Sequence, residues 1–174
     1  MDHPSAKSVA HRVFRSLPGE WSLERIAVSR NNFQPGGRFS GSARFQPQAN
    51  SSTASGLEYL YTEEGEFTFA GGKLTAKRHY VWRYDERSDT ISVWFVRTDD
   101  HTRADYLYHE VEFAKASPGS STVTAGASHL CVRDLYGVKY TFHISEDKVH
   151  SWRLLCEVKG PAKDYTLDSA YSRL

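Results

Sequence analysis

The side chains that could do chemistry in this sequence are a few histidines, tyrosines and charged residues. The candidate catalytic residues are His129, His109, Tyr80 and Glu63. A histidine suits proton transfer because its unperturbed pKa lies at about 6.5. Tyr80 and Tyr140 could donate hydrogen bonds to a developing enolate, and Arg78 could act as an electrostatic partner. These residue types predict acid–base chemistry that needs no cofactor.

Most of these residues share one face of the predicted strands with many apolar side chains, since residues two apart along a strand point the same way. An ordinary core would use leucine and valine at such positions, because a buried charge is costly unless it is paired. The polar members therefore either pair with one another or line a cavity that holds a polar ligand. The predicted ligand-binding residues are Tyr59, Tyr61, Arg78, Trp82, Cys131, Tyr140, Phe142 and Trp152.

Two functions fit such a cavity. The first is binding of an oxygenated aromatic or polycyclic hydrophobic molecule, because aromatic walls supply packing area and a few polar groups orient the ligand. The second is a cofactor-independent cyclase, isomerase or lyase that acts on a natural-product-like substrate in the same cavity. A filled barrel that only contacts other proteins is the alternative without a ligand, and the volume of the interior distinguishes it from the first two.

Some of the polar residues also have a purely structural interpretation. His129 could bond a neighbouring strand or Asp134. Arg25 could close one end of the barrel over Trp21 through a cation–π contact, which would stabilise the fold by roughly a kcal/mol.

A metal site is a further possibility. His129 and Cys131 lie on one face of a predicted strand, with His109 on a neighbouring strand, and zinc accepts such ligands. No fourth ligand is evident in the sequence. No glycine-rich loop stands between a strand and a helix, as phosphate binding would require. We therefore expect no metal and no cofactor.

One short helix and a series of strands must position these side chains. Apolar residues recur at helical spacing over 5–17, with Ser5 as the cap and Pro18 and Gly19 as the stop. After them, polar and apolar residues alternate between turn clusters, which is typical of an antiparallel meander. The predicted strands are 20–28, 38–46, 57–63, 73–84, 90–96, 106–115, 122–132, 136–144 and 148–159, with a further one at 165–171. The pattern predicts an all-β antiparallel barrel of nine or ten strands, with a mobile loop at 46–56.

Length and composition favour a single domain over residues 1–174. With 22 Lys+Arg against 21 Asp+Glu, the chain carries no basic footprint for nucleic acid. Its apolar stretches fall far short of the roughly 20 residues that span a bilayer, and residues 1–17 lack the pattern of a secretory signal. We expect a cytoplasmic monomer or homodimer whose partner is a hydrophobic small molecule. Cys131 and Cys156 should stay unpaired, because another strand lies between theirs and the compartment is reducing.

Several motifs add a resemblance. Gly19-x-Trp21 opens the first predicted strand after a short helix, as the G-x-W signature of lipocalins does. The sequence also contains Y-x-E-x-G at 61–65, R-x-Y-x-W at 78–82, H-x-C-x-x-D-x-Y at 129–136 and G-P-x-K-x-Y at 160–165. Over nearly its whole length the chain thus resembles a little-characterised calycin-like family of bacteria and fungi. The segment 104–109 departs from the more compact Phe-His pair of that family. The resemblance implies a lipocalin-like barrel and no settled activity.

Overall fold

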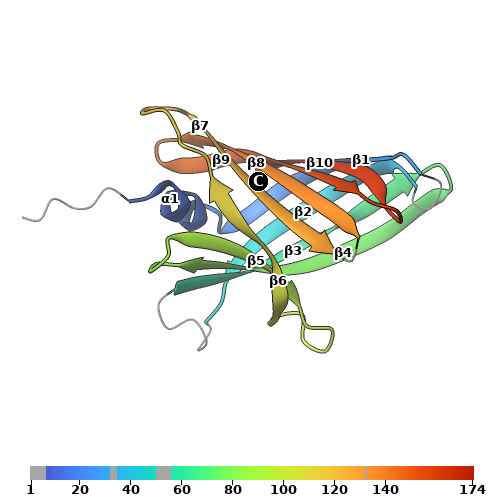
Figure 1. Ribbon diagram of the computed structural model, residues 1–174, viewed down its shortest axis with the longest axis horizontal. Coiled ribbons are helices and arrows are strands. Elements are labelled where there is room, and N and C mark those ends of the chain that lie inside the picture. The colour runs from blue at the N-terminus through green and yellow to red at the C-terminus, as the bar shows by residue number, and fades with distance from the viewer. Residues whose placement is uncertain (1–6, 32–34, 50–55, 132) are drawn as a thin grey trace, which may run out of the picture.

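Antiparallel strands follow one another around a closed barrel, with a short helix before them, in the computed structural model (Figure 1). It describes residues 7–31, 35–49, 56–131 and 133–174, without the side chains of residues 56, 130 and 131. The elements are α1 (Val9–Ser16), β1 (Gly19–Ser29), β2 (Gly37–Pro47), β3 (Gly56–Phe69), β4 (Gly72–Asp85), β5 (Thr90–Val96), β6 (Ala104–Phe113), β7 (Thr122–Cys131), β8 (Asp134–Ser145), β9 (Lys148–Lys159) and β10 (Asp164–Arg173). The predicted all-β antiparallel barrel is confirmed.

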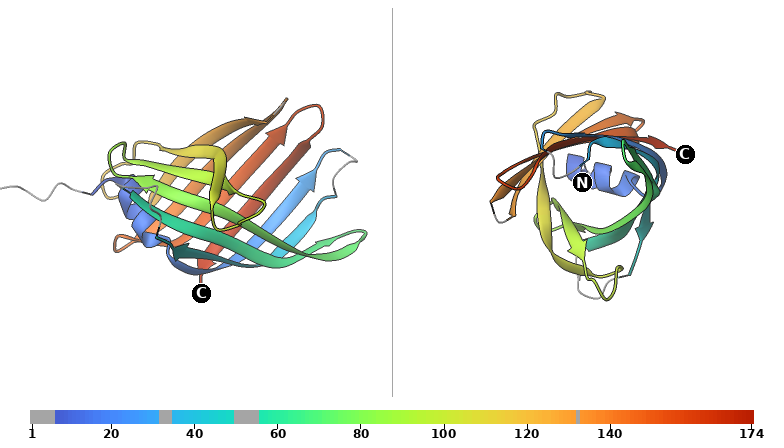
Figure 2. Two further views of the ribbon diagram at one scale, coloured as in Figure 1. Left: turned by 90° about the horizontal axis from the view of Figure 1, so that it is seen from below. Right: turned by 90° about the vertical axis from the view of Figure 1, so that its right-hand side faces the viewer.

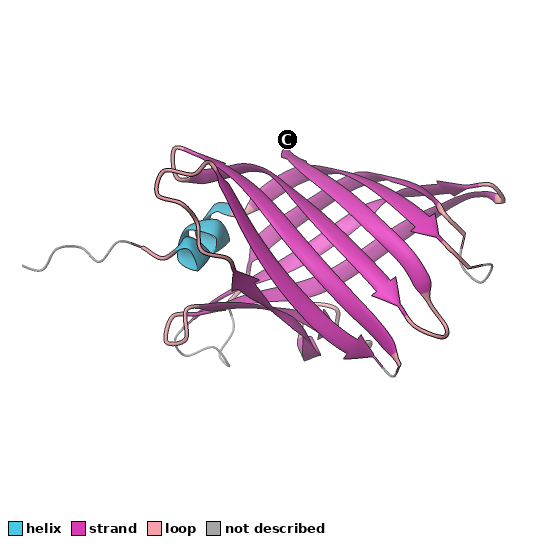
Figure 3. Ribbon diagram, turned by 45° about the horizontal axis from the view of Figure 1, so that its top comes forward, coloured by secondary structure: helices cyan, strands magenta, loops and turns pink. Residues whose placement is uncertain are grey.

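The first and last strands close the barrel. β1 pairs with β10 from Trp21↔Arg173 to Ser29↔Tyr165, and every other strand pairs with its neighbours in the sequence. Figure 3 shows that the strands are steeply tilted relative to the barrel axis, as closure of a sheet into a barrel requires. β8 lies between β7 and β9, as expected from the sequence, and Cys156 on β9 is a free thiol.

The helix α1 closes one end of the barrel, where it lies across the opening (Figure 2). Its Phe14 is fully buried and stacks on Tyr59 of β3 with ring centroids 4.1 Å apart. Leu17, just past the helix, is also fully buried, and its carbonyl accepts a hydrogen bond from the indole of Trp21. None of the described residues forms a helix with the length and apolar character of a membrane span.

Two expectations about this end of the barrel are wrong. The helix begins at Val9 and is capped by Ser8, whose side chain accepts from the backbone N–H of His11, whereas the expected cap, Ser5, lies outside the described residues. The cation over Trp21 is Arg173, at 4.2 Å from the ring centroid, and not Arg25. Arg173 reaches the ring because β10 ends beside the start of β1.

The outer face of β4 and β5 holds a tryptophan, because alternation along β5 directs Trp94 away from the barrel interior. Trp94 lies there under Arg83, whose guanidinium carbon is 4.9 Å from the ring centroid, and its indole donates to Ser92. Arg83 in turn donates to Glu58 across 2.7 Å. The outward-facing, half-buried position of Trp94 is thus explained by a cation–π contact on the outer wall.

The strands β3 and β4 are longer than their hydrophobic alternation indicates. β3 continues to Phe69, well beyond the predicted end at Glu63, and forms an extended hairpin with β4. The predicted loop at 46–56 falls mostly outside the described residues, although Gln46 and Pro47 still belong to β2.

A pair of glycines lets β2 and β3 approach closely. Gly41 and Gly65 are register partners, and a Cβ on Gly41 would lie 2.7 Å from the Cα of Gly65 and against the carbonyl oxygen of Glu64. Since backbone atoms cannot yield as a flexible side chain does, a larger residue here would force the two strands apart.

We therefore expect Gly41→Ala to lower the free energy of unfolding by about 1–3 kcal/mol. The control is Gly126→Ala on β7, where the new Cβ would meet only the carbonyl of Val138 at 3.7 Å. Urea unfolding of both variants measures the difference. Equal stability of the two variants would contradict the close approach of β2 and β3.

Candidate functional site

The barrel interior is packed near α1 and contains two adjoining cavities further along. The inner cavity has a volume of about 80 Å³ and the outer cavity, toward the end opposite α1, about 270 Å³. Arg25, Glu63, Arg78 and Leu167 line both, so the two cavities meet at these side chains. The inner cavity is otherwise lined by Tyr61, Tyr80, Trp82, Val93, Tyr108, His109, Val138, Tyr140, Trp152, Leu154, Cys156, Ser169 and Tyr171.

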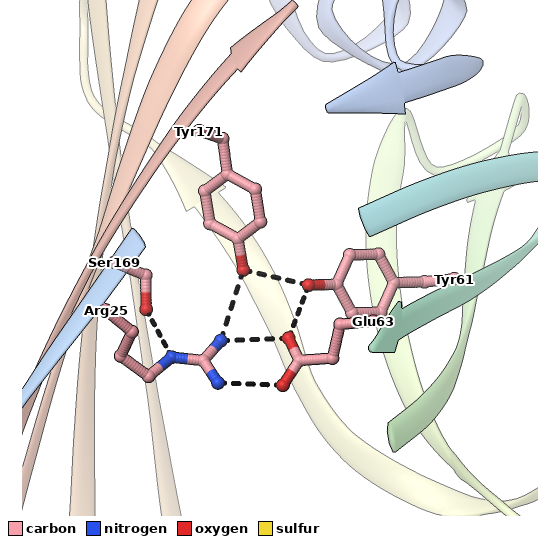
Figure 4. A network of polar contacts seen from close by, with 5 residues as sticks. All are labelled: Arg25, Tyr61, Glu63, Ser169 and Tyr171. Atoms are coloured by element: carbon pink, nitrogen blue, oxygen red, sulfur yellow. Dashed lines mark hydrogen bonds and ion pairs between the residues drawn. The ribbon is translucent and has the colours of Figure 1, made fainter. Parts of the chain in front are cut away.

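Arg25 and Glu63, which line both cavities, form an ion pair at the centre of a polar network that Figure 4 shows. The guanidinium of Arg25 donates to both carboxylate oxygens of Glu63, across 2.7 and 2.9 Å, and its Nε donates to Ser169. Only 3% of the Glu63 side chain is exposed, against 11% of that of Arg25. Such a bidentate pair is the strong form of a charged contact, and it needs further polar partners when water is excluded.

Two tyrosines supply those partners. The Tyr61 hydroxyl donates to Glu63 across 2.6 Å, and Tyr171 lies 2.9 Å from Tyr61 and 3.4 Å from Arg25. Because the Tyr61 hydrogen is directed to Glu63, Tyr171 is the donor to Tyr61. The Tyr171 ring is itself fixed by stacking on Trp152 at 3.6 Å. The network therefore joins β1, β3, β9 and β10.

The charges of this network remain at neutral pH. Burial alone would raise the pKa of Glu63, but the hydrogen bonds and charge of Arg25 outweigh it and lower that pKa below its ordinary value. Burial would lower the pKa of Arg25, and the bond to Glu63 reverses this and raises it. Burial raises the pKa of Tyr171 to about 12 and that of Tyr61 well above its ordinary value, so both stay neutral phenols.

A second polar pair lies elsewhere on the wall of the inner cavity. Nε2 of His109 is 2.7 Å from the hydroxyl of Tyr140, and only 4% of His109 is exposed. Burial lowers the pKa of His109 to about 4, with a smaller contribution from His129. Its Nδ1 is buried and has no hydrogen-bond partner among the described residues. At neutral pH the pair is an uncharged imidazole beside a phenol, which can take up or give back a proton.

The barrel wall has a side opening between β6 and β7. The two strands pair only at Glu112↔Gly126 and Phe113↔Ala125, and then diverge. Tyr108 and His109 line both this opening and the inner cavity, so they separate the two spaces. The side opening is further lined by Leu107, Glu110, Glu112, Gly126, Ala127, Ser128 and His129.

Eight of the predicted site residues lie on the wall of the inner cavity, as expected: Tyr61, Glu63, Arg78, Tyr80, Trp82, His109, Tyr140 and Trp152. His129 lies instead in the side opening, with its ring 5.4 Å from that of Tyr108, because β7 has moved away from β6 there. Tyr59 packs on α1 and Phe142 is fully buried against Trp152, so neither lines a cavity. The side chain of Cys131 lies outside the described part of the chain.

Several cavity residues were not predicted. Tyr108 was missed because of a β-bulge: Val93 pairs with His109 while Trp94 pairs with Leu107. The bulge turns Tyr108 inward and leaves Leu107, which shares the parity of the inward-facing His109, 39% exposed. Ser169 and Tyr171 were also missed. They lie two residues apart on the last strand and so share its inward face, and this alternation could have identified them. Val93, Val138, Leu154 and Cys156 face the interior as their strand parity predicts, although they were not among the predicted site residues. Leu167 was not predicted, and Arg25 was expected at the barrel end.

The described residues contain no group of three or more histidine, cysteine, aspartate or glutamate side chains that could hold a metal ion. His109 and His129 lie near each other, but His109 is bonded to Tyr140. The cavity chemistry that these residues support is hydrogen bonding, ion pairing and proton transfer.

We expect Glu63→Gln to lower the free energy of unfolding by about 3–5 kcal/mol, because it leaves the buried charge of Arg25 without its partner. The double variant Arg25→Met, Glu63→Leu removes both charges and should be more stable than Glu63→Gln. Urea unfolding measures both. A double variant as unstable as the single one would show that burial of the pair is not the controlling factor.

The ion pair of Arg25 and Glu63 should also make the stability of the protein depend on pH. Because the pKa of Glu63 is lower in the folded protein than its ordinary 4.5, its contribution to stability is full above that value and is lost as the pH falls below it. We expect the free energy of unfolding to drop with pH in that range more steeply for the natural chain than for Glu63→Gln. If the free energy of unfolding fell equally with pH in both proteins, Glu63 would not be the source of this pH dependence.

Comparison with known proteins places the sequence in a family. No curated protein matches the chain. A model of a family of unknown function (DUF6314) matches residues 17–173, which include all the strands and the whole polar network. The chain therefore belongs to the family of unknown function DUF6314.

Proposed function

We propose that this protein binds an oxygenated aromatic or polycyclic hydrophobic small molecule inside the barrel. The observation that supports this most is the Arg25–Glu63 network, which sets charged and phenolic groups in an aromatic wall beside a cavity. A barrel that needed only a stable core would gain little from such a pair, because apolar residues of similar volume stabilise a protein as well or better.

The dimensions of the interior fit a ligand of modest size. The two adjoining cavities together reach the lower end of the range for small-molecule sites, about 300 Å³. Phe39, Phe67 and Leu74 line the outer cavity and suit a ring system. The oxygen functions of the ligand would then face Arg78, Tyr80 and the network at the boundary.

A second candidate function is a cofactor-independent isomerase, cyclase or lyase that uses the same cavity. The contact between His109 and Tyr140 favours it, because an imidazole and a phenol in hydrogen-bond contact on the cavity wall are groups that can pass on a proton. Tyr140 is held as a neutral phenol by burial, which raises its pKa. The pair could move a proton between two positions of a bound substrate.

We also retain two expectations from the sequence as proposals: that the barrel is related to the calycins, and that the protein works in the cytoplasm. The buried free thiol of Cys156 agrees with a reducing compartment. A relation to the calycins agrees with the size of the barrel, because barrels of this size typically enclose a ligand.

Calorimetry with naphthol tests the binding proposal. Leu167→Trp adds bulk where the two cavities meet and should weaken binding at least about ten-fold. Leu155→Trp adds the same bulk to the outward-facing neighbour of Cys156 on β9 and should bind as the natural chain does. Circular dichroism checks the fold of both. Equal affinity in the two variants would place the ligand elsewhere.

Native mass spectrometry of the purified protein can identify a compound bound inside the barrel. Whether the protein converts that compound then distinguishes an enzyme from a binding protein. If the protein is an enzyme, His109→Gln should lower turnover by about 10²–10⁴ with a smaller effect on affinity. Tyr140→Phe, which keeps the ring and removes the hydroxyl, should act in the same direction. Unaltered recovery of the compound after long incubation with the natural chain would favour a binding protein.

A further inference from the structure

The charges at the boundary of the two cavities are not balanced. Arg25 and Glu63 neutralise each other, and every carboxylate oxygen of Glu63 already accepts from Arg25 or Tyr61. Arg78 is the third charged residue of this boundary and lines both cavities. Within the described ranges it forms no ion pair. Its positive charge is therefore in excess.

Arg78 faces the cavities because of its register. It lies directly across from Glu63 in the pairing of β3 with β4, so both point into the barrel. Glu63 nevertheless bonds to Arg25 on β1, which leaves the guanidinium of Arg78 exposed toward the outer cavity. Tyr80, two residues further along β4, lines the inner cavity together with Arg78.

The other titratable groups of the two cavities do not offset this charge. Burial raises the pKa values of Tyr80, Tyr165 and the Cys156 thiol, so all three are neutral at neutral pH. Burial lowers the pKa of His109 to about 4, which makes it neutral as well. The excess positive charge belongs to Arg78 alone in this part of the described chain.

The wall beside Arg78 is apolar. Leu74 remains 47% exposed although it faces the outer cavity, and Phe67 and Ala76 continue the same face of the hairpin. Phe39 and Leu167 complete the wall from β2 and β10. A cation at the inner end of an apolar wall is complementary to a molecule with one acidic head and a hydrophobic body.

We propose that the ligand is a hydrophobic monoanion, such as an aromatic carboxylic acid, whose acid group binds Arg78 while its body lies in the outer cavity. This inference rests on the proposed function and specifies its ligand class. A planar guanidinium suits a carboxylate because it can donate two parallel hydrogen bonds. The phenol of Tyr80 can donate a further bond to the same group.

Two probes that differ by a single acidic group test this proposal. Anilinonaphthalenesulfonate and N-phenylnaphthylamine share the same aromatic body, and only the first carries an acidic group. Their fluorescence gives a dissociation constant for each. The natural chain should bind the anionic probe more tightly, and cinnamate should displace it better than cinnamyl alcohol does.

The matched variants are Arg78→Gln and Lys77→Gln. Lys77 immediately precedes Arg78 on β4, lies on the outer face and pairs with Glu64 at 3.5 Å. Its loss therefore changes the net charge equally without touching the cavity. Arg78→Gln should weaken the anionic probe about ten-fold and leave the neutral probe unchanged. Lys77→Gln should change neither.

Two results would overturn the proposal, and they differ from each other. Binding of both probes with equal affinity, unaffected by Arg78→Gln, would show that the cavity takes ligands but does not select anions. Binding of neither probe by a correctly folded natural chain would contradict the proposed function itself. Circular dichroism and urea unfolding of each variant verify the fold, because anilinonaphthalenesulfonate also binds partly unfolded proteins.

Discussion

A buried ion pair imposes the main constraint on this barrel. Once Arg25 and Glu63 lie inside, each charge must find enough polar partners to offset the loss of water, and the interior is arranged to supply them. Ser169 and Tyr171 on β10 serve the guanidinium, and Tyr61 on β3 serves the carboxylate. The pair thus fixes the relative positions of strands from both sides of the β1 strand.

The pair also divides the interior. On the side of α1, aromatic rings fill the barrel: Phe45 packs edge-on against Trp82 at 5.2 Å, and Tyr140 stacks on Phe142 at 5.7 Å. On the other side the wall carries smaller or exposed apolar residues such as Ala27, Ala76 and Leu74. The half near α1 is therefore largely packed and keeps only the small inner cavity, while the other half contains the larger outer cavity.

Strand alternation was enough to predict much of this structure. A barrel must bury one face of every strand, so the polar and apolar positions separate in the sequence, and Tyr61, Tyr80 and Trp82 fall on the correct face. The same argument could not pair the charges. Glu63 lies opposite Arg78 in the sheet but bonds to Arg25, two strands away, which depends on how the barrel closes.

Local irregularity limited the prediction elsewhere. Alternation assumes an unbroken register, and the bulge in β6 exchanges Tyr108 for Leu107 on the inner face. His129 has the parity of an inward residue, yet β7 has left its neighbour at that point. The bulge in β6 has no glycine or proline to mark it, so the sequence offers no local signal there. β7 leaves β6 just after Gly126, and a glycine inside a strand can mark such an irregularity.

The weak contact between β6 and β7 has a consequence for how the barrel fluctuates. These strands are consecutive in the sequence but share few backbone hydrogen bonds, whereas β1 and β10 are paired along nearly their whole length. The chain therefore behaves as two curved sheets, β1 to β6 and β7 to β10, joined along one edge. Thermal motion that spreads the opposite edges breaks few bonds, and it costs less free energy than separation at β1 and β10. Solvent and small solutes should accordingly reach Tyr108 and His109 from the side more often than they reach any other buried part of the barrel.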